Sequence, residues 1–443
     1  MLTNFFKKTL TVFSVLAIVL MASCQSDFQN QLDQASVASQ FNSTPGRYII
    51  TLKKNEFDQE NPTFKRRRAF LERVAQMRSI VANMVGNQDN ESAVGHVYTK
   101  TFYGFSARLS AKALERLKQN PQVAHIQEDK EISLVPVQAK IVSMLKNGSE
   151  KAIGNPVSDQ EETDIDRFVS GEQLIPYGIE RVGGPQDGTG KTVWIIDTGV
   201  DLENIELNID QERSINLITQ TDFLGRPINN PQPATAQDDN GHGTHVAGTI
   251  AAKNDNIGVS GVAAGATVVA VKVLDAQGNG YDSDVIAGID YVAENAAPGD
   301  VVNMSLGGEV NPDFEGDTGD DLAVKAAADK GLIFAIAAGN DAVPAVNFSP
   351  ARVSYENVYV VSAMDVHDEF AIGFSNYGDP ISYSAPGVAV LSLWPDNRVA
   401  QLDGTSMASP HVAGVLLMTN NNPHTDGTVK NDPAPPADPI IHL

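Results

Sequence analysis

The chain has 443 residues, of which 42% are hydrophobic and 20% are charged, and its formal net charge is −23. This length allows two or three domains with a sizeable core, and the acidic balance argues against a nucleic-acid-binding protein. The single cysteine, Cys24, excludes an intrachain disulfide. The charge is uneven, because residues 171–443 hold 11 Lys and Arg against 37 Asp and Glu, whereas residues 1–170 are close to neutral.

The N-terminus has the pattern of an export signal, predicted over residues 1–23. Lys7 and Lys8 precede an apolar run over residues 10–22, which is short for a membrane span. The sequence Met-Ala-Ser-Cys that ends at Cys24 resembles a bacterial lipobox, in which the cysteine is lipidated, although Leu is usual where Met21 stands. An ordinary signal peptide with an incidental cysteine is the alternative. Residues 24–45 are polar and are expected to form a tether.

Residues 46–134 predict a small α+β domain. Ser110 is a predicted helix cap, and the order of strands and helices is β-α-β-β-α-β, which is typical of a ferredoxin-like fold. The basic run at residues 65–68 is interpreted as a solvated helix face rather than a nucleic-acid site. Taken alone, this domain would be a binding module. Strand patterns fall at residues 47–52, 96–102 and 123–126, and helical patterns at 64–84 and 110–117.

After a polar linker at residues 135–170, short apolar strands alternate with helical patterns. This alternation predicts a parallel, doubly wound α/β sheet. The strand patterns are at residues 193–196, 267–273, 301–304, 332–337 and 358–361, and the helical patterns are at residues 242–252, 283–296 and 320–330.

Three motifs in this second part carry side chains suited to nucleophilic catalysis. Asp197 follows a buried strand, His242 enters a Gly-rich helix, and Ser406 stands in the first turn of an apolar helix, where backbone N–H groups can receive an oxyanion. Each has a structural alternative: Asp197 could form an Asx turn, His242 could be a structural histidine, and Ser406 could cap the helix. A metal site at His242 and His245 is disfavoured, because the spacing places no third ligand.

The order Asp197, His242, Ser406 resembles that of the subtilisin-like serine proteases, within a match that runs from about residue 174 to residue 418. The resemblance implies that Ser406 is the nucleophile, His242 the general base and Asp197 the group that orients the imidazole. Asn340, in Ala-Ala-Gly-Asn, would donate its side-chain N–H to the oxyanion. An α/β-hydrolase is disfavoured, because Ala408 stands where the nucleophile elbow needs a second glycine.

The resemblance implies a subtilisin-like three-layer α/β catalytic domain over residues 171–420, followed by a polar tail at 421–443. Residues 46–134 resemble an inhibitor I9-type propeptide, which would act as intramolecular inhibitor and folding template. Maturation cleavage is expected within the linker at residues 135–170.

The substrate cleft is also implied by the resemblance, which is closest to the proteinase K group. Ser305, Leu306 and Gly307 would form one rim, along which extended peptide adds as a strand. Phe348 would line the other wall, which has no acidic residue, so an apolar or aromatic P1 preference with broad tolerance is expected. The Ser349–Pro350 bond is a predicted cis peptide.

No cofactor is expected for the chemistry and no residue is assigned to a metal. Structural calcium is allowed for without being placed, and Ser382 stands where the family commonly offers an aspartate ligand.

The expected protein is therefore an exported bacterial serine endopeptidase, made as a self-processing zymogen that acts on proteins and peptides and not on nucleic acid. It would be extracellular or periplasmic after maturation, with membrane contact only through a lipid anchor on the precursor. The alternative is a catalytically silent surface lipoprotein that binds peptides.

Overall fold

The computed structural model describes residues 45–53, 66–86, 89–134, 139–144, 163–219, 235–310, 314 and 316–443. The predicted export signal, Cys24 and nearly all of the predicted tether lie outside these residues. Within the described ranges, no helix is long and apolar enough to cross a membrane.

The N-terminal domain has the predicted β-α-β-β-α-β order. Its sheet has the strand order β2-β3-β1-β4, and β1 runs antiparallel to both neighbours. The Ser110 hydroxyl caps α3 as predicted, because it accepts a hydrogen bond from Ala113 N (3.2 Å). The elements are β1 (Gly46–Leu52), α2 (Arg66–Val85), β2 (Ala93–Tyr98), β3 (Gly104–Leu109), α3 (Ala111–Lys118) and β4 (Val123–Glu128).

Strand β2 ends at Tyr98, earlier than the predicted residue 102. The backbone N–H groups of the next three residues, 99–101, donate to the carboxylate of Asp290 at 2.7–3.2 Å instead of pairing within the sheet. A contact with the second domain thus determines where the strand ends.

The second domain is built on a ten-stranded sheet with the path β10-β12-β8-β14-β16-β18-β19-β23-β22, and β9 pairs with β12 beside this path. All the strand patterns predicted for this domain are strands of this sheet. All pairings along the path are parallel except that of β22 with β23. The strands are β8 (Thr192–Asp197), β9 (Asn208–Ile209), β10 (Ile215–Asn216), β12 (Thr267–Lys272), β14 (Val301–Met304), β16 (Ile333–Ala337), β18 (Val358–Met364), β19 (Ile381–Pro386), β22 (His424–Thr428) and β23 (Pro439–His442).

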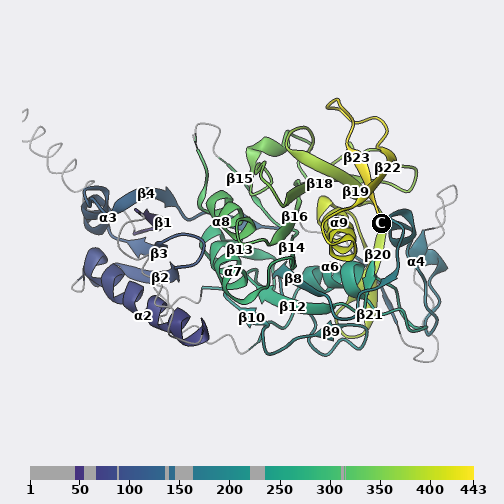
Figure 1. The fold of residues 1–443 in the computed structure, drawn as a ribbon, viewed down its shortest axis with the longest axis horizontal. Helices are drawn as coiled ribbons and strands as arrows, with labels where there is room; N and C mark the ends of the chain where they lie inside the picture. The colour runs from purple at the N-terminus through teal and green to yellow at the C-terminus, as the bar shows by residue number, and fades with distance from the viewer. Residues whose placement is uncertain are drawn as a thin grey trace, which may run out of the picture.

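Helices cover both faces of this sheet, so the domain has the expected three layers (Figure 1). Helices α6 (His242–Ala251) and α9 (Thr405–Thr419) pack into one hydrophobic cluster. Helices α7 (Asp282–Asn295) and α8 (Gly319–Ala328) pack into the other. The remaining elements are β5 (Glu131–Ser133), β6 (Lys140–Ser143), α4 (Asp164–Arg167), α5 (Tyr177–Arg181), β7 (Gln186–Asp187), β11 (Ala263–Ala264), β13 (Asn279–Tyr281), β15 (Gly308–Glu309), η1 (Ala345–Asn347), β17 (Phe348–Ser349), β20 (Val390–Trp394) and β21 (Arg398–Leu402).

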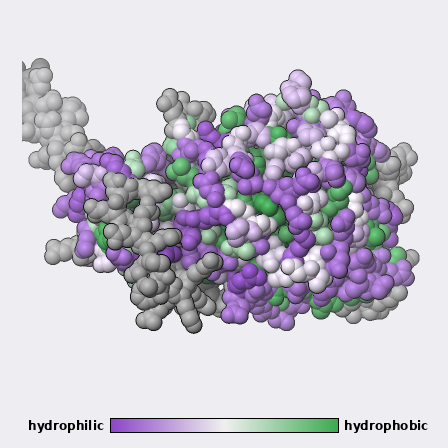
Figure 2. Space-filling view, in the orientation of Figure 1, coloured by the Kyte–Doolittle hydropathy of each residue, from purple (hydrophilic) through white to green (hydrophobic). Residues whose placement is uncertain are grey.

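The N-terminal domain lies against α7 and α8 (Figure 1). Ile49 and Tyr98 are buried in the same cluster as these two helices. Polar contacts join the domains as well, since His96 Nε2 lies 2.8 Å from Asp284 Oδ1 and Lys100 Nζ lies 2.9 Å from Glu294 Oε2. Hydrophilic residues cover most of the face seen in Figure 2, and hydrophobic residues there are scattered among them.

The segment expected to be a polar tail, residues 421–443, is instead part of the second domain. Strand β23 pairs in parallel with β19, and Ile440 and Ile441 are buried. Asp438 accepts a hydrogen bond from the Ser362 hydroxyl (2.7 Å). A pair of isoleucines among prolines and aspartates gives too short an apolar pattern to predict this strand.

The expected polar linker, residues 135–170, also contains regular structure. Strand β6 pairs with β21, and the short helix α4 buries Ile165. These two elements belong to the second domain by their packing.

Candidate active site

The three predicted catalytic side chains come together at the carboxyl edge of the central strands. Asp197 is the last residue of β8, His242 is the first residue of α6, and Ser406 lies in the first turn of α9. Because β8, β14 and β16 are parallel, their carboxyl ends open onto the same edge, where ligands bind in α/β sheets.

Asp197 and His242 form a buried, hydrogen-bonded pair. Imidazole Nδ1 lies 2.8 Å from Asp197 Oδ1 and 3.0 Å from Oδ2. The backbone N–H of Thr198 also donates to Asp197 Oδ1 (2.7 Å), and the carboxylate is fully buried. Because Asp197 holds Nδ1, the imidazole ring is fixed in orientation. The other ring nitrogen, Nε2, is then the atom that would accept a proton, as a general base requires.

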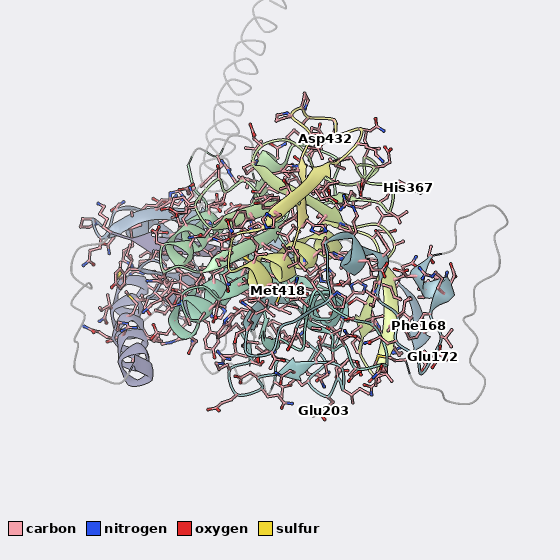
Figure 3. The ribbon with its side chains drawn as sticks, turned by 45° about the vertical axis from the view of Figure 1, so that its right-hand side comes forward. Phe168, Glu172, Glu203, His367, Met418 and Asp432 are labelled. Carbon is pink, nitrogen blue, oxygen red and sulfur yellow. The ribbon has the colours of Figure 1, made fainter. Side chains whose placement is uncertain are left out.

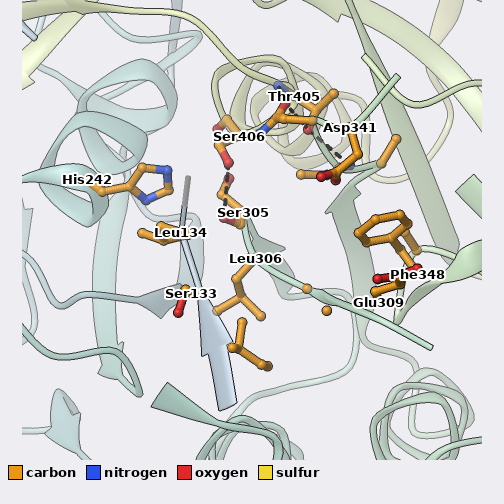
Figure 4. A pocket seen from close by; sticks show the side chains of 18 of the residues that line it. Ser133, Leu134, His242, Ser305, Leu306, Glu309, Asp341, Phe348, Thr405 and Ser406 are labelled. Atoms are coloured by element: carbon orange, nitrogen blue, oxygen red, sulfur yellow. Dashed lines mark hydrogen bonds between the residues drawn. The ribbon is translucent and has the colours of Figure 1, made fainter. Parts of the chain in front are cut away.

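The Ser406 hydroxyl donates to the backbone carbonyl of Ser305 at 3.1 Å (Figure 4). Among the described residues, no hydrogen bond joins Ser406 to His242 Nε2. The Ser305 hydroxyl in turn donates to Ser406 O (2.8 Å), so the predicted rim residue also holds the start of α9. Catalytic hydrogen bonds are often long or poorly aligned without substrate and tighten when it binds, so this geometry does not exclude His242 as the base.

Asn340, the predicted oxyanion donor, lines the same pocket as Ser406. Its amide oxygen accepts hydrogen bonds from Thr405 N (2.8 Å) and Thr405 Oγ1 (3.0 Å), beside the nucleophile. The amide nitrogen is therefore the group that remains to donate into the pocket, which Asn340 and Ser406 both line. Gly339 has a φ of 104°, and a Cβ at this position would lie 2.3 Å from Asn376 Nδ2, so only glycine fits before Asn340.

The pKa of His242 is raised above 6.5 in this site. Burial of the imidazole alone would lower the pKa, but the charge of Asp197, its hydrogen bond and the charge of Asp238 together outweigh burial.

Asp238 is a buried carboxylate that the sequence analysis missed. It accepts hydrogen bonds from Gly241 N (2.8 Å), Thr244 N (3.0 Å) and the Thr198 hydroxyl (3.0 Å). It therefore ties the start of α6 to the end of β8, which are the two elements that carry His242 and Asp197. Its position before the His motif is the only signal that the sequence gives.

His245 packs in the core of the domain rather than in the cleft. Its Nε2 lies 3.1 Å from both Val390 O and Ala400 O, and burial beside His242 lowers its pKa to about 3. No group of three or more His, Cys, Asp or Glu residues within the described ranges could hold a metal ion.

The predicted substrate-binding residues line one pocket with the catalytic side chains. Strand β15 pairs antiparallel with β17, so the rim that begins at Ser305 is joined to the wall that carries Phe348. Leu306 and Phe348 project into the same cavity in Figure 4. The Ser349–Pro350 peptide bond is cis, as predicted.

Strand β5 of the N-terminal domain occupies this cleft. It pairs antiparallel with β13, and Leu134 N donates to Gly278 O (3.0 Å). Leu134 lies beside His242 in Figure 4 and lines the pocket together with Ser406. The N-terminal domain therefore covers part of the site that a substrate would use.

One acidic pair away from the cleft has unsatisfied oxygens. Glu206 is buried, neither of its carboxylate oxygens has a hydrogen-bond partner, and burial together with the charge of Asp255 raises its pKa to about 7. Near it, the Gln173 amide donates to the carbonyls of Lys253 (2.9 Å) and Ile257 (3.2 Å). Carboxylate and carbonyl oxygens are the ligands that Ca²⁺ prefers. By contrast, the Ser382 hydroxyl lies at hydrogen-bond distance from Val360 N within the sheet.

An aspartate, a histidine and a serine at the carboxyl edge of a parallel sheet, with an amide donor beside the serine, define the class of serine hydrolases. The model of the subtilase family, peptidase S8, matches residues 188–431, and the model of peptidase inhibitor I9 matches residues 47–135. The chain belongs to the subtilase family and is a serine-type protease with an I9 propeptide domain.

Two individual relatives agree with this assignment. Alkaline serine exoprotease A of Vibrio alginolyticus is 37% identical over 325 residues, which span 73% of this chain and 53% of that protein. The extracellular serine proteinase of Thermus sp. (strain Rt41A) is 33% identical over 379 residues, which span 84% of this chain and 80% of that protein. A solved structure described as a cold adapted subtilisin-like serine proteinase covers 60% of this chain and 98% of its own, with 33% identity and a TM-score of 0.48.

Proposed function

We propose that the protein is a secreted serine endopeptidase that cleaves proteins and peptides through an acyl-enzyme intermediate. The observation that carries this proposal is the buried Asp197–His242 pair beside Ser406, in a cleft that also contains Asn340.

In the proposed reaction, His242 Nε2 takes the hydroxyl proton of Ser406 as Oγ attacks the scissile carbonyl. The negative oxygen is then stabilised by Asn340 Nδ2 and by the backbone N–H of Ser406. His242 gives the proton to the leaving amine as the peptide bond breaks, which leaves the acyl group on Ser406 Oγ. His242 then deprotonates a water that attacks the acyl carbon, and it returns that proton to Ser406 Oγ as the new carboxyl product leaves. Asp197 stabilises the imidazolium throughout.

The cleft is expected to prefer an apolar or aromatic P1 side chain. Phe348 and Leu306 line its wall, and this preference rests on these two side chains. The wall was expected to have no acidic residue, but the acidic residues Glu309, Asp341 and Asp403 also line this pocket. Ser305, Leu306 and Gly307 supply the rim along which the substrate backbone would lie. A Cβ at Gly307 would lie 2.9 Å from Ser349 O, so glycine also keeps the two walls close.

The N-terminal domain is expected to inhibit the precursor until the chain cleaves itself. Strand β5 already lies in the cleft, and the domain contributes basic and histidine side chains against acidic ones, such as Arg73 against Glu294 (3.2 Å). Because parallel sheets with long-range pairing form slowly, a preformed domain docked on α7 and α8 can also serve as a folding template.

A structural calcium ion is proposed near Glu206. Glu206 and Asp255 would supply carboxylate oxygens, and the backbone N–H of Lys253 donates to Glu206 O (3.0 Å), which holds this segment beside Glu206. The ion would stabilise the fold and would take no part in the chemistry.

Export is proposed from the predicted signal and from the Thermus relative, which is described as extracellular. If Cys24 is lipidated, the anchor belongs to the propeptide, and processing releases the protease from the membrane. Mature enzyme that stays lipid-bound after processing would count against this arrangement.

The alternative, a silent peptide-binding lipoprotein, predicts that the chain does not process itself. Intact-mass analysis of the wild-type chain and of Ser406→Ala, expressed side by side, separates the two functions. The protease is supported if the wild type is found as separate propeptide and catalytic chains while Ser406→Ala stays intact. The binder is supported if both proteins stay intact although folded.

A further inference from the structure

In the sequence, strand β6 falls between the propeptide domain and the matched subtilase region. In the structure, however, it is part of the catalytic domain. It pairs antiparallel with β21 over four residues, from Lys140 opposite Gln401 to Ser143 opposite Arg398. It thereby makes the β20–β21 hairpin a three-stranded sheet.

Met144, which directly follows β6, anchors this strand in the core. Its side chain is fully buried, and a Cβ at Gly258 would lie 2.6 Å from its sulfur. Its backbone is also held, because Met144 N donates to Asn397 O (3.1 Å) and Gly171 N donates to Met144 O (3.0 Å).

Helix α4 and the residues after it close the same unit. Lys140 Nζ lies 2.6 Å from Asp166 Oδ1, Ile165 is fully buried, and Asp164 Oδ2 accepts from Tyr177 N (2.7 Å). Phe168 packs against the same cluster and lies beside this sheet in Figure 3.

The sheet that β6 extends supports the helix of the catalytic histidine. His245, one turn into α6, lies within hydrogen-bond distance of carbonyls on both β20 and β21, and the Ser392 hydroxyl donates to His245 O (2.7 Å). Removal of β6 would expose one edge of this sheet and the pocket that holds Met144.

We infer that residues 139–171 stay with the catalytic domain when the propeptide is removed, so that the chain is cut before β6. The unit formed by β6, Met144 and α4 would thus be an N-terminal brace of the mature enzyme. By contrast, β5 enters the cleft as a substrate would and pairs there with β13. The inference rests on the proposed self-processing and refines where the processing falls.

The direct test is the mass and N-terminal sequence of the processed wild-type protein, measured after denaturation and after the propeptide has been separated under native conditions. We expect residues 140–144 in the catalytic chain, or in a fragment that co-purifies with it. A catalytic preparation that begins after Gly171 and lacks this segment overturns the inference while leaving the protease function standing. A wild-type chain that stays whole, as Ser406→Ala should, contradicts the self-processing and the inference together.

A matched pair of substitutions on the segment gives a second readout in the processed enzyme. Met144→Ala empties a fully buried position, and its Tm should fall by about 5 °C or more. Ile141→Ala lies three residues away on β6 at a position that is 39% exposed, and its Tm should change far less. Equal Tm values for the processed wild type and Met144→Ala would show that the brace is absent from the mature enzyme.

Discussion

Asn340 offers the sharpest test of how the site stabilises an oxyanion, because its two polar atoms are expected to do different work. Its oxygen holds Thr405 through two hydrogen bonds, and its nitrogen is expected to donate to the substrate. Loss of the corresponding donor in subtilisin costs about 10²–10³ in turnover, which is roughly 2.7–4 kcal/mol. Asn340→Ala should therefore lower kcat by at least about 10², with KM little changed because the interaction forms in the transition state.

Thr405→Val separates the donor from the anchor. It removes the hydroxyl bond to Asn340 (3.0 Å) and the bond from Gly339 N (3.1 Å), but keeps the backbone N–H bond to the Asn340 oxygen. Each neutral hydrogen bond contributes about 0.5–1.5 kcal/mol. If the transition state loses stabilisation equal to one such bond, kcat should fall by about tenfold or less.

The assay is steady-state hydrolysis of a chromogenic peptide by variants processed with immobilised wild-type enzyme, which is then removed. Ser406→Ala treated in the same way is the blank. An Asn340→Ala enzyme with wild-type kcat would remove Asn340 from the oxyanion hole. If Thr405→Val lost as much as Asn340→Ala, Asn340 would act only as an anchor.

Four further predictions follow from the structure. The kcat/KM of the processed enzyme should fall at acid pH with a midpoint above 6.5, because the pKa of His242 is raised and only the neutral imidazole accepts the Ser406 proton. Asp238→Asn should move this midpoint to lower pH, because it removes a negative charge that raises the pKa, and an unmoved midpoint in an active variant would contradict that role. Phe348→Ala should reduce kcat/KM more for peptides with an aromatic P1 residue than for peptides with alanine at P1. Equal losses would show that Phe348 does not contact the P1 side chain. Calcium at 100 times its Kd should stabilise the wild type by about 2.7 kcal/mol, measured as a rise in Tm over an EDTA control, whereas Glu206→Gln should respond little. An equal rise in Tm with calcium in Glu206→Gln would show that the ion binds at another site.

The sequence predicted the sheet and the elements that carry the three candidate catalytic residues, because both are encoded locally. Buried parallel strands appear as short apolar runs, and Asp197, His242 and Ser406 each stand at the end of such a run or at the start of a helix. The parallel arrangement of the strands then brings these three residues to one edge.

The features that the sequence did not predict depend on partners far along the chain. Strand β6 is recognisable only beside β21, and β23 only beside β19, since each is a short segment with few apolar residues. The role of Asp238 likewise depends on Thr198 and the start of α6 meeting around one carboxylate. The hydroxyl of Ser406 donates to the carbonyl of Ser305 rather than to His242, and the sequence motif alone does not predict this partner.

Activation of Ser406 by His242 and Asp197 can be tested by fluorophosphonate labelling of the processed protein. A fluorophosphonate reacts with an activated serine hydroxyl and leaves other serines untouched. We expect one label, mapped to Ser406 by peptide mass analysis, and a large loss of labelling in His242→Ala. A folded, processed wild-type protein that takes no label, or takes it at another residue, would contradict the account.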